Sequence, residues 1–171
     1  MKTPMLCAFL SFAQILVITS LPFTSADLVD DTCKKTPYAD FCASNLRSDP
    51  RSSTADTATL GVIMVDKVDA NAKSTVTKIE DLLRQSPDPG KKQALTSCEE
   101  SYNNIVSALV PSSKESLTKG DPKFAVEYMK AAATDATSCE QGFGGNSPLS
   151  DSNDYENKAG SVASAIASSL L

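Results

Sequence analysis

Apolar residues recur every three or four positions along four stretches of the chain. This spacing places them on one face of an α-helix and predicts four amphipathic helices. The first begins at Asp56 and ends in the segment 86–90, because Pro87, Pro89 and Gly90 do not continue a helix. Its apolar positions are Leu60, Met64, Val68, Ala72, Val76, Ile79 and Leu83. The second has the most regular spacing, at Leu95, Cys98, Tyr102, Ile105 and Leu109.

Prolines and glycines mark where the later helices begin and end. We expect Pro111 to kink the second helix rather than end it, because 112–118 still has a helical pattern. Gly120 suits the end of that helix, Asp121 suits the N-cap of the third and Pro122 suits its first turn. The third helix carries Val126, Met129, Ala133, Ala136 and Phe143 on one side, with Cys139 near its end.

The fourth helix is predicted over 154–171, with Tyr155, Ala159, Val162, Ile166 and Leu170 on its face. The polar stretch 150–154 before it and the many small residues within it favour weaker packing there. No segment has the pattern of a β-strand. The sequence therefore predicts an all-α protein with an up-down-up-down four-helix bundle over 51–171. A short helical hairpin over 27–50, divided at Pro37, precedes the bundle.

Cysteine usage indicates two disulfides. Of five cysteines, Cys7 lies in the leader described below, which leaves Cys33, Cys42, Cys98 and Cys139. A zinc site is disfavoured because the chain has no histidine and no closely spaced cysteine pair. Proximity pairs Cys33 with Cys42, and antiparallel packing of the second and third helices pairs Cys98 with Cys139.

The first 26 residues have the pattern of a cleaved signal peptide. Lys2 gives a positive start, an apolar run follows, and Thr24-Ser25-Ala26 suits a signal peptidase. The run is too interrupted for a membrane anchor. Cleavage after Ala26 would leave one secreted domain, 27–171, and would take the formal net charge from −5 to −6. Such an acidic chain does not suit nucleic acid or an anionic membrane as a partner.

The sequence lacks the residues that most catalytic sites use. Without histidine it has neither the commonest general base nor the commonest metal ligand. No Gly-x-Ser-x-Gly nucleophile motif is present, and the cysteines are expected to be oxidised. Carboxylate pairs such as Glu99/Glu100 and Glu80/Asp81 fall on predicted exposed faces. We therefore expect a binding protein, with no catalytic residues, no metal and no cofactor.

One turn stands out as a candidate binding site. Lys123 falls in the first turn of the third helix, where the helix dipole disfavours a cation, and Phe124 is next to it. The residues Asp121, Pro122, Lys123 and Phe124 could offer a cleft an ammonium group and an aromatic ring on a rigid turn. Alternatively, Phe124 covers the end of the core and Lys123 extends to solvent.

The cysteine framework, the leader and the predicted bundle together resemble the plant invertase and pectin methylesterase inhibitor family. The early pair lies in Thr32-Cys33-Lys34-Lys35-Thr36-Pro37-Tyr38-Ala39-Asp40-Phe41-Cys42, and the resemblance covers 27–171. The resemblance implies the disulfide pairing given above, Cys33 with Cys42 and Cys98 with Cys139. Pro122-Lys123-Phe124 is similar to a turn of the invertase-inhibitor branch, which enters the active-site pocket of the invertase.

The resemblance implies a one-to-one complex with a cell-wall or vacuolar acid invertase, in which Lys123 faces the carboxylates of the glycosidase. It also implies a mildly acidic location, the apoplast or the vacuole, and pH-dependent binding. Two alternatives stay open. The sister branch inhibits pectin methylesterase through a face of the bundle. A structural or ligand-carrying helical protein would instead have a roomy apolar cavity.

Overall fold

The computed structural model describes the backbone of residues 25–171 and the side chains from Leu28 onward. The expected signal peptide thus lies almost wholly outside the described residues, and its cleavage stays a prediction. Within the described range all regular structure is helical, which confirms the all-α class.

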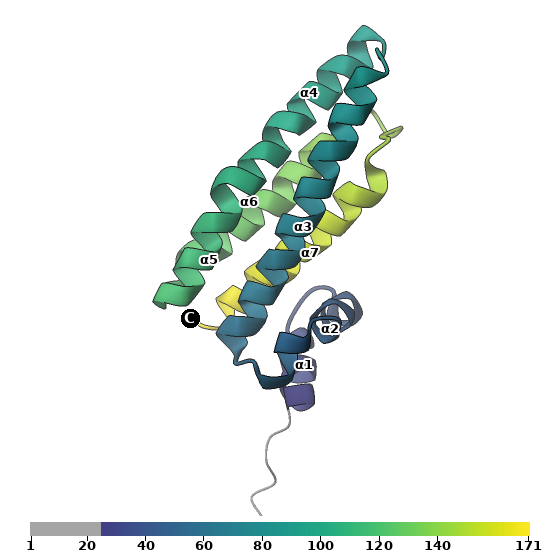
Figure 1. Ribbon diagram of the computed structural model, residues 1–171. Helices are drawn as coiled ribbons and strands as arrows, with labels where there is room; N and C mark the ends of the chain where they lie inside the picture. Colours follow the sequence, from purple (N-terminus) through teal and green to yellow (C-terminus); the bar gives the residue numbers. More distant parts are fainter. Residues whose placement is uncertain (1–24) are drawn as a thin grey trace, which may run out of the picture.

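Four antiparallel rods form the body of the structure (Figure 1). They are α3 (Thr57–Arg84), the joined helices α4 (Pro89–Asn104) and α5 (Val110–Lys119), α6 (Pro122–Gln141), and α7 (Ser150–Ser168). Each rod packs against the next one along the chain, and α7 also packs against α3. This arrangement is the predicted up-down-up-down bundle, closed by contact of its first and last rods.

Two aspartates start the first two rods. Asp56 precedes α3, and its Oδ1 accepts the backbone N–H of Thr59 at 2.8 Å. Asp88 precedes α4 in the same way and accepts the N–H of Lys91 at 3.0 Å. Each bond satisfies a helix N–H that has no partner inside the helix. Pro89 lies in the first turn of α4. The break between the first two rods is therefore shorter than the predicted segment 86–90.

The second rod contains a π-helical turn just before Pro111. A π-helical segment, Ile105–Leu109, joins α4 to α5, and Pro111 is the second residue of α5. A proline has no N–H, and its ring collides with the carbonyl four residues earlier. The π turn accommodates this misfit without ending the helix. The prediction that Pro111 would not end the rod is confirmed.

The core lies between the four rods and follows the predicted faces. On α3 the expected positions Leu60, Met64, Val68, Ala72 and Ile79 are buried, while Val76 and Leu83 are half-buried. On α4 and the π turn, Leu95, Cys98, Tyr102 and Ile105 are buried, and Leu109 is half-buried. The Cys98–Cys139 disulfide links α4 to α6 with a Cα–Cα distance of 5.0 Å, as predicted.

A helical hairpin, α1 (Ser25–Cys33) and α2 (Ala39–Arg47), precedes the bundle and contains the Cys33–Cys42 disulfide. It lies beside the lower part of α3 (Figure 1) and also contacts α7. The ring of Phe41 meets the ring of Tyr155 edge-on at 5.1 Å, and the Tyr155 hydroxyl donates to Asn45 Oδ1 at 2.5 Å. The polar link after the hairpin is a short 3-10 helix, Pro50–Thr54.

The last rod packs more closely than its composition indicated. It begins at Ser150, four residues before the predicted start, and ends at Ser168. Eight of its residues are buried, and they are Asn153, Glu156, Ala159, Gly160, Val162, Ala163, Ile166 and Ala167. The small residues allow α7 to approach α6 closely, and the polar residues near its start contact three other rods. The expectation that this helix packs more weakly is therefore wrong.

Candidate partner-binding turn

The turn between α5 and α6 is built by a glycine and a proline. Gly120 closes α5 with φ +76°, and the N–H of Asp121 donates to the carbonyl of Ser116 at 2.9 Å. This six-residue bond with a left-handed glycine is the Schellman ending of a helix. Pro122 then begins α6 with its φ already restricted to helical values. The chain therefore reverses direction within two residues, between two rods of the bundle.

Asp121 occupies the predicted N-cap position without making the expected bond. Its backbone has φ −118° and ψ 65°, and its side chain accepts no capping hydrogen bond. The N–H groups of the first turn of α6 therefore lack a side-chain acceptor from Asp121. Lys123 is in this same turn, so a cation and the positive end of the helix dipole face the same end of the bundle.

Phe124 is one of few large apolar side chains exposed in the described part of the chain, with half of its surface open to solvent. Half of Phe124 is therefore available to a partner while the other half is covered, so both interpretations of the turn stay open. The two lysines near Phe124 in the sequence differ in whether they form an ion pair. Lys119 forms an ion pair with Glu115, whereas Lys123 is exposed and forms none within the described residues.

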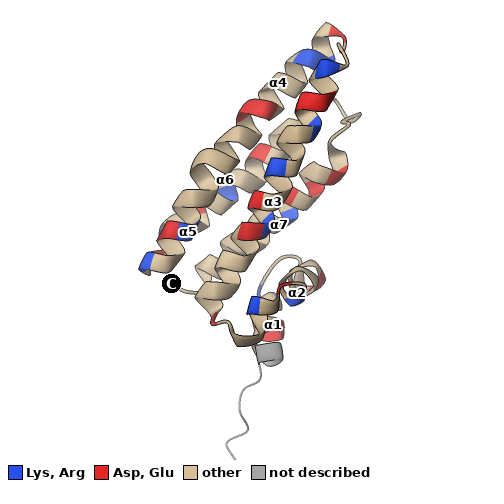
Figure 2. Cartoon of the chain, in the orientation of Figure 1, with Lys and Arg blue, Asp and Glu red and all other residues tan. Residues whose placement is uncertain are grey.

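The other sequence candidates do not form a site. Glu80, Asp81 and Glu100 are exposed and Glu99 is half-buried, as expected for solvated charges. No group of three or more potential metal ligands is found in the described residues. Figure 2 shows acidic and basic segments interspersed along the rods rather than gathered on one face. No helix in 25–171 is both long and apolar enough to cross a bilayer.

Three shallow grooves run along the bundle surface, away from the turn. One of about 390 Å³ lies between α4 and α6, and two lie between α6 and α7. Small polar residues contribute to their walls, among them Ser97, Ser138, Thr137 and Asn157. A roomy apolar cavity, which a ligand-carrying protein would need, is not among them.

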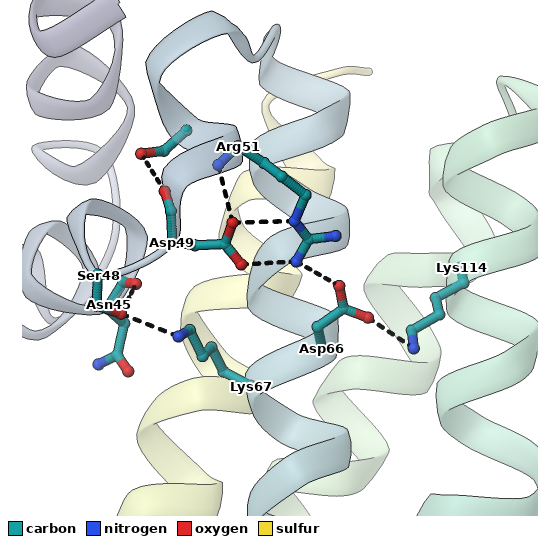
Figure 3. Close-up of polar contacts among 8 residues, drawn as sticks. Asn45, Ser48, Asp49, Arg51, Asp66, Lys67 and Lys114 are labelled. Atoms are coloured by element: carbon teal, nitrogen blue, oxygen red, sulfur yellow. Dashed lines mark hydrogen bonds and ion pairs between the residues drawn. The ribbon is translucent and has the colours of Figure 1, made fainter.

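An ionic network holds the hairpin end of the chain against the bundle (Figure 3). Arg51 binds both carboxylate oxygens of Asp49, at 2.9 and 2.7 Å, and also Asp66 of α3 at 2.7 Å. Lys114 of α5 binds the other oxygen of Asp66 at 2.7 Å. These four residues, the hairpin clamp, connect the 3-10 helix to the rod that leads into the turn.

The clamp shifts the acidity of its carboxyls. The hydrogen bond from Arg51 lowers the pKa of Asp49 to about 2. Burial alone would raise the pKa of Asp66, but Lys114 and Arg51 outweigh it and lower the value. Sequence reasoning missed this network, because Arg51 lies in what reads as a polar link and Lys114 is 48 positions from Asp66 along the chain.

Comparison with known proteins gives a consistent result. The family described as "Plant invertase/pectin methylesterase inhibitor" matches residues 27–170. "Cell wall / vacuolar inhibitor of fructosidase 1" from Arabidopsis thaliana is 37% identical over 143 residues, which are 84% of this chain and 69% of that protein. "Pectinesterase inhibitor" from Actinidia deliciosa is 36% identical over 118 residues, which are 69% of this chain and 63% of that protein.

Solved structures agree on the fold. A crystal structure of a mutant form of a pectin methylesterase inhibitor from Arabidopsis superposes with a TM-score of 0.70 and 22% sequence identity. The match covers 80% of this chain and 92% of that one. At this identity the likeness concerns the helical bundle alone.

Proposed function

Because the chain belongs to the plant invertase/pectin methylesterase inhibitor family, we propose that it inhibits an acid invertase, a β-fructofuranosidase. The turn of Pro122, Lys123 and Phe124 would enter the active-site cleft of the enzyme. The observation that carries this proposal is the combination of an exposed Phe124 with an unpaired Lys123 on a rigid turn.

The chemistry of the expected partner suits these two side chains. Glycosidases generally act through a pair of carboxyl groups that flank the bond to be cleaved. The ammonium of Lys123 would pair with whichever carboxyl is ionised, and the positive end of α6 would add to this attraction. Phe124 would supply apolar contact against the cleft wall, as aromatic anchors do in many interfaces. The inhibitor would compete with the sugar for the same space.

The backbone of the turn supports a tight complex. Gly120 in its left-handed conformation and Pro122 with its fixed φ leave the turn little freedom before binding. A preorganised loop loses less conformational entropy when it binds. The turn is also anchored on both sides by rods of the bundle, so its ends do not have to order in the complex.

We further propose that the protein acts outside the cytosol, in the cell wall or the vacuole, as a one-to-one complex with its target. A leader with the pattern of a signal peptide and two disulfides support secretion. The names of similar Arabidopsis proteins refer to the same two locations. N-terminal sequencing of the secreted protein tests the leader, because cleavage after Ala26 would give a chain that begins at Asp27.

Inhibition of pectin methylesterase is the second candidate. The 36% identity with a pectinesterase inhibitor favours it. In that case the contacts would come from a face of the bundle, and the grooves beside α6 would be natural places for the partner to dock. Changes at Lys123 and Phe124 would then have little effect on inhibition.

One experiment separates the two candidates. The purified secreted protein is added near pH 5 to an acid invertase and, in parallel, to a pectin methylesterase. We expect inhibition of the invertase with a dependence on sucrose concentration typical of competition. Inhibition of the esterase alone would contradict the proposal and establish the second candidate.

Two variants then test the turn itself. We expect Lys123→Ala and Phe124→Ala each to weaken inhibition of the invertase by about thirtyfold or more, the effect of losing an interface hot spot. Lys130→Ala is the matched control for the charge, because Lys130 is exposed on the same helix. Tyr38→Ala is the control for the aromatic ring, because Tyr38 is exposed on the hairpin. Equal inhibition by all four variants would exclude the turn as the binding element.

A further inference from the structure

A glutamate lies in the middle of the bundle without a positive partner. The side chain of Glu156, on α7, has no exposed surface. Its Oε2 accepts one hydrogen bond, from Asn71 Nδ2 of α3 at 2.6 Å. Its Oε1 accepts none from the described residues. Buried carboxylates are ordinarily paired with a cation or surrounded by donors, so this environment is typical of a neutral acid.

The groups that face Glu156 do not supply a positive charge. Asp69 of α3 is nearby and negative, and it is itself paired with Lys73 at 2.8 Å and with Lys114 at 3.8 Å. Tyr102 of α4 is fully buried, and its hydroxyl donates to Asn153 Oδ1 at 2.8 Å. Glu140 of α6 binds the amide of Asn153 at 2.7 Å and adds a second negative charge near Tyr102.

The one cation of α7, Lys158, is paired with Asp154 at 2.7 Å rather than with Glu156. The hairpin reaches this part of α7 through the uncharged Asn45, which binds Tyr155. Burial and the proximity of Glu156 raise the pKa values of both Tyr102 and Tyr155, so neither tyrosine ionises near neutral pH. A neutral tyrosine carries no positive charge and an ionised one would be negative, so neither ring can compensate a charge on Glu156.

We propose that Glu156 is a proton-dependent latch for α7: the neutral acid permits close packing of α7 on α3, and the ionised form weakens that packing. An ionised Glu156 would need water or additional donors, which are reached only if the start of α7 separates from α3. That separation would also break the bond from Asn71 to the Ser152 carbonyl, at 3.1 Å, and the contact of Tyr155 with the hairpin.

The direction of the pH effect follows from linkage. Burial raises the pKa of Glu156 from 4.5 to about 8, with Asp69 adding to the shift and Asn71 opposing it. The folded chain therefore holds this proton more tightly than the unfolded chain does. The contribution to stability is complete below pH 4.5, is lost as pH rises, and is gone once pH exceeds about 8. The unfolding equilibrium constant should rise up to tenfold per pH unit within this window.

The composition of the chain makes it easier to assign a loss of stability between pH 5 and 8 to Glu156. The chain contains no histidine, so no other side chain of ordinary acidity titrates between pH 5 and 8. The second carboxyl with a raised pKa is Asp135 of α6, which burial shifts upward although it is only half-buried. Asp135→Asn is therefore the matched control for Glu156→Gln.

The test compares urea unfolding of the full secreted chain at pH 5, 6, 7, 8 and 9. We expect the urea midpoint of the wild type and of Asp135→Asn to fall steeply with pH, and that of Glu156→Gln to stay nearly level. Parallel profiles for the wild type and Glu156→Gln would overturn the proposal. Because the measurement concerns folding, its result is independent of whether the protein inhibits an invertase.

A direct titration covers the case in which Glu156→Gln does not fold. Carboxyl-carbon NMR of the wild type, labelled at glutamate, follows each side chain as pH rises. One glutamate resonance should titrate above pH 7, together with shifts of backbone amides in the first turns of α7. If every glutamate titrates below pH 6 in the folded protein, the latch does not exist.

Discussion

Gly160 of α7 lies directly against the backbone of Met129 on α6. A Cβ built at position 160 would be 2.8 Å from the Met129 carbonyl oxygen and 3.0 Å from the backbone nitrogen of Ala133. Both neighbours are backbone atoms, so they cannot turn aside as the end of a side chain could. The absence of a side chain at this position sets how closely the last two rods pack.

We expect Gly160→Ala to lower the free energy of unfolding by about 1–3 kcal/mol, because the rods must move apart to accept the methyl group. This loss would exceed the small gain that alanine normally brings in a helix. Urea unfolding at pH 5 measures the change. Gly90→Ala is the control, since a Cβ there would meet only Asp88 Oδ1, at 3.4 Å. A Gly160→Ala protein as stable as the control would contradict the close-packing argument.

The rods themselves could be predicted from the sequence because their apolar spacing is local information. Each predicted face on α3 and α4 is largely buried, the Cys98–Cys139 disulfide follows once the rods are antiparallel, and the Cys33–Cys42 disulfide follows from proximity along the chain. The break at Gly120 was also predictable, since few residues other than glycine adopt its φ of +76°.

What the sequence did not reveal depends on contacts between distant segments. Asp66 and Lys114 are on different rods, and nothing in the local pattern of either residue indicates their ion pair. Glu156 lies three residues before Ala159 on the buried face of α7, which packs against α3 and α6, although a charged side chain gives no local sign of burial. The only local indication was the run of small residues after it, which signals close approach of a neighbouring helix rather than weak packing.

The candidate site was found from the sequence in outline only. Pro122, Lys123 and Phe124 could be selected because a cation in a first helical turn is unfavourable. Whether Phe124 covers the core or faces solvent depends on how α5 and α6 end relative to each other. The sequence does not contain that relation in any single segment, whereas the structure shows a Phe124 with half of its surface open to solvent.

The hairpin clamp should fail in strong acid. The folded-state pKa of Asp49 is lowered from 3.8 to about 2 by Arg51. The folded chain thus binds this proton less readily than the unfolded chain, so the contribution is complete above pH 4 and is lost as pH falls toward 2. We expect Asp49→Asn to reduce the loss of stability between pH 4 and 2, measured by urea unfolding. Asp40→Asn, on an exposed face of α2, should leave that loss as it is in the wild type.

The two disulfides should contribute unequally. Cys98 and Cys139 are 41 positions apart, whereas Cys33 and Cys42 are 9 apart. By the loop-entropy estimate, replacing both members of the longer link by alanine costs about 4 kcal/mol, and the shorter link about 3 kcal/mol. Urea unfolding of the two double variants at pH 5 tests this order. A larger loss for the shorter link would mean that the hairpin contributes to stability through more than its loop.

Replacing Gly120 should affect the turn more than the bundle. An alanine at φ +76° costs about 1–2 kcal/mol, although a Cβ there would meet no atom within 4 Å, so the penalty is one of backbone conformation. Relaxing that strain would redirect Pro122 and Lys123, and we expect Gly120→Ala to weaken invertase inhibition by about tenfold. Gly120→Asn should retain more inhibition, because asparagine tolerates this conformation better. Gly144→Ala introduces a similar backbone strain (φ +61°) away from the turn. It therefore separates the effect of the strain on stability from its effect on inhibition. It should lower stability by a similar amount and leave inhibition unchanged, and equal losses of inhibition in both alanine variants would disprove the role of the turn.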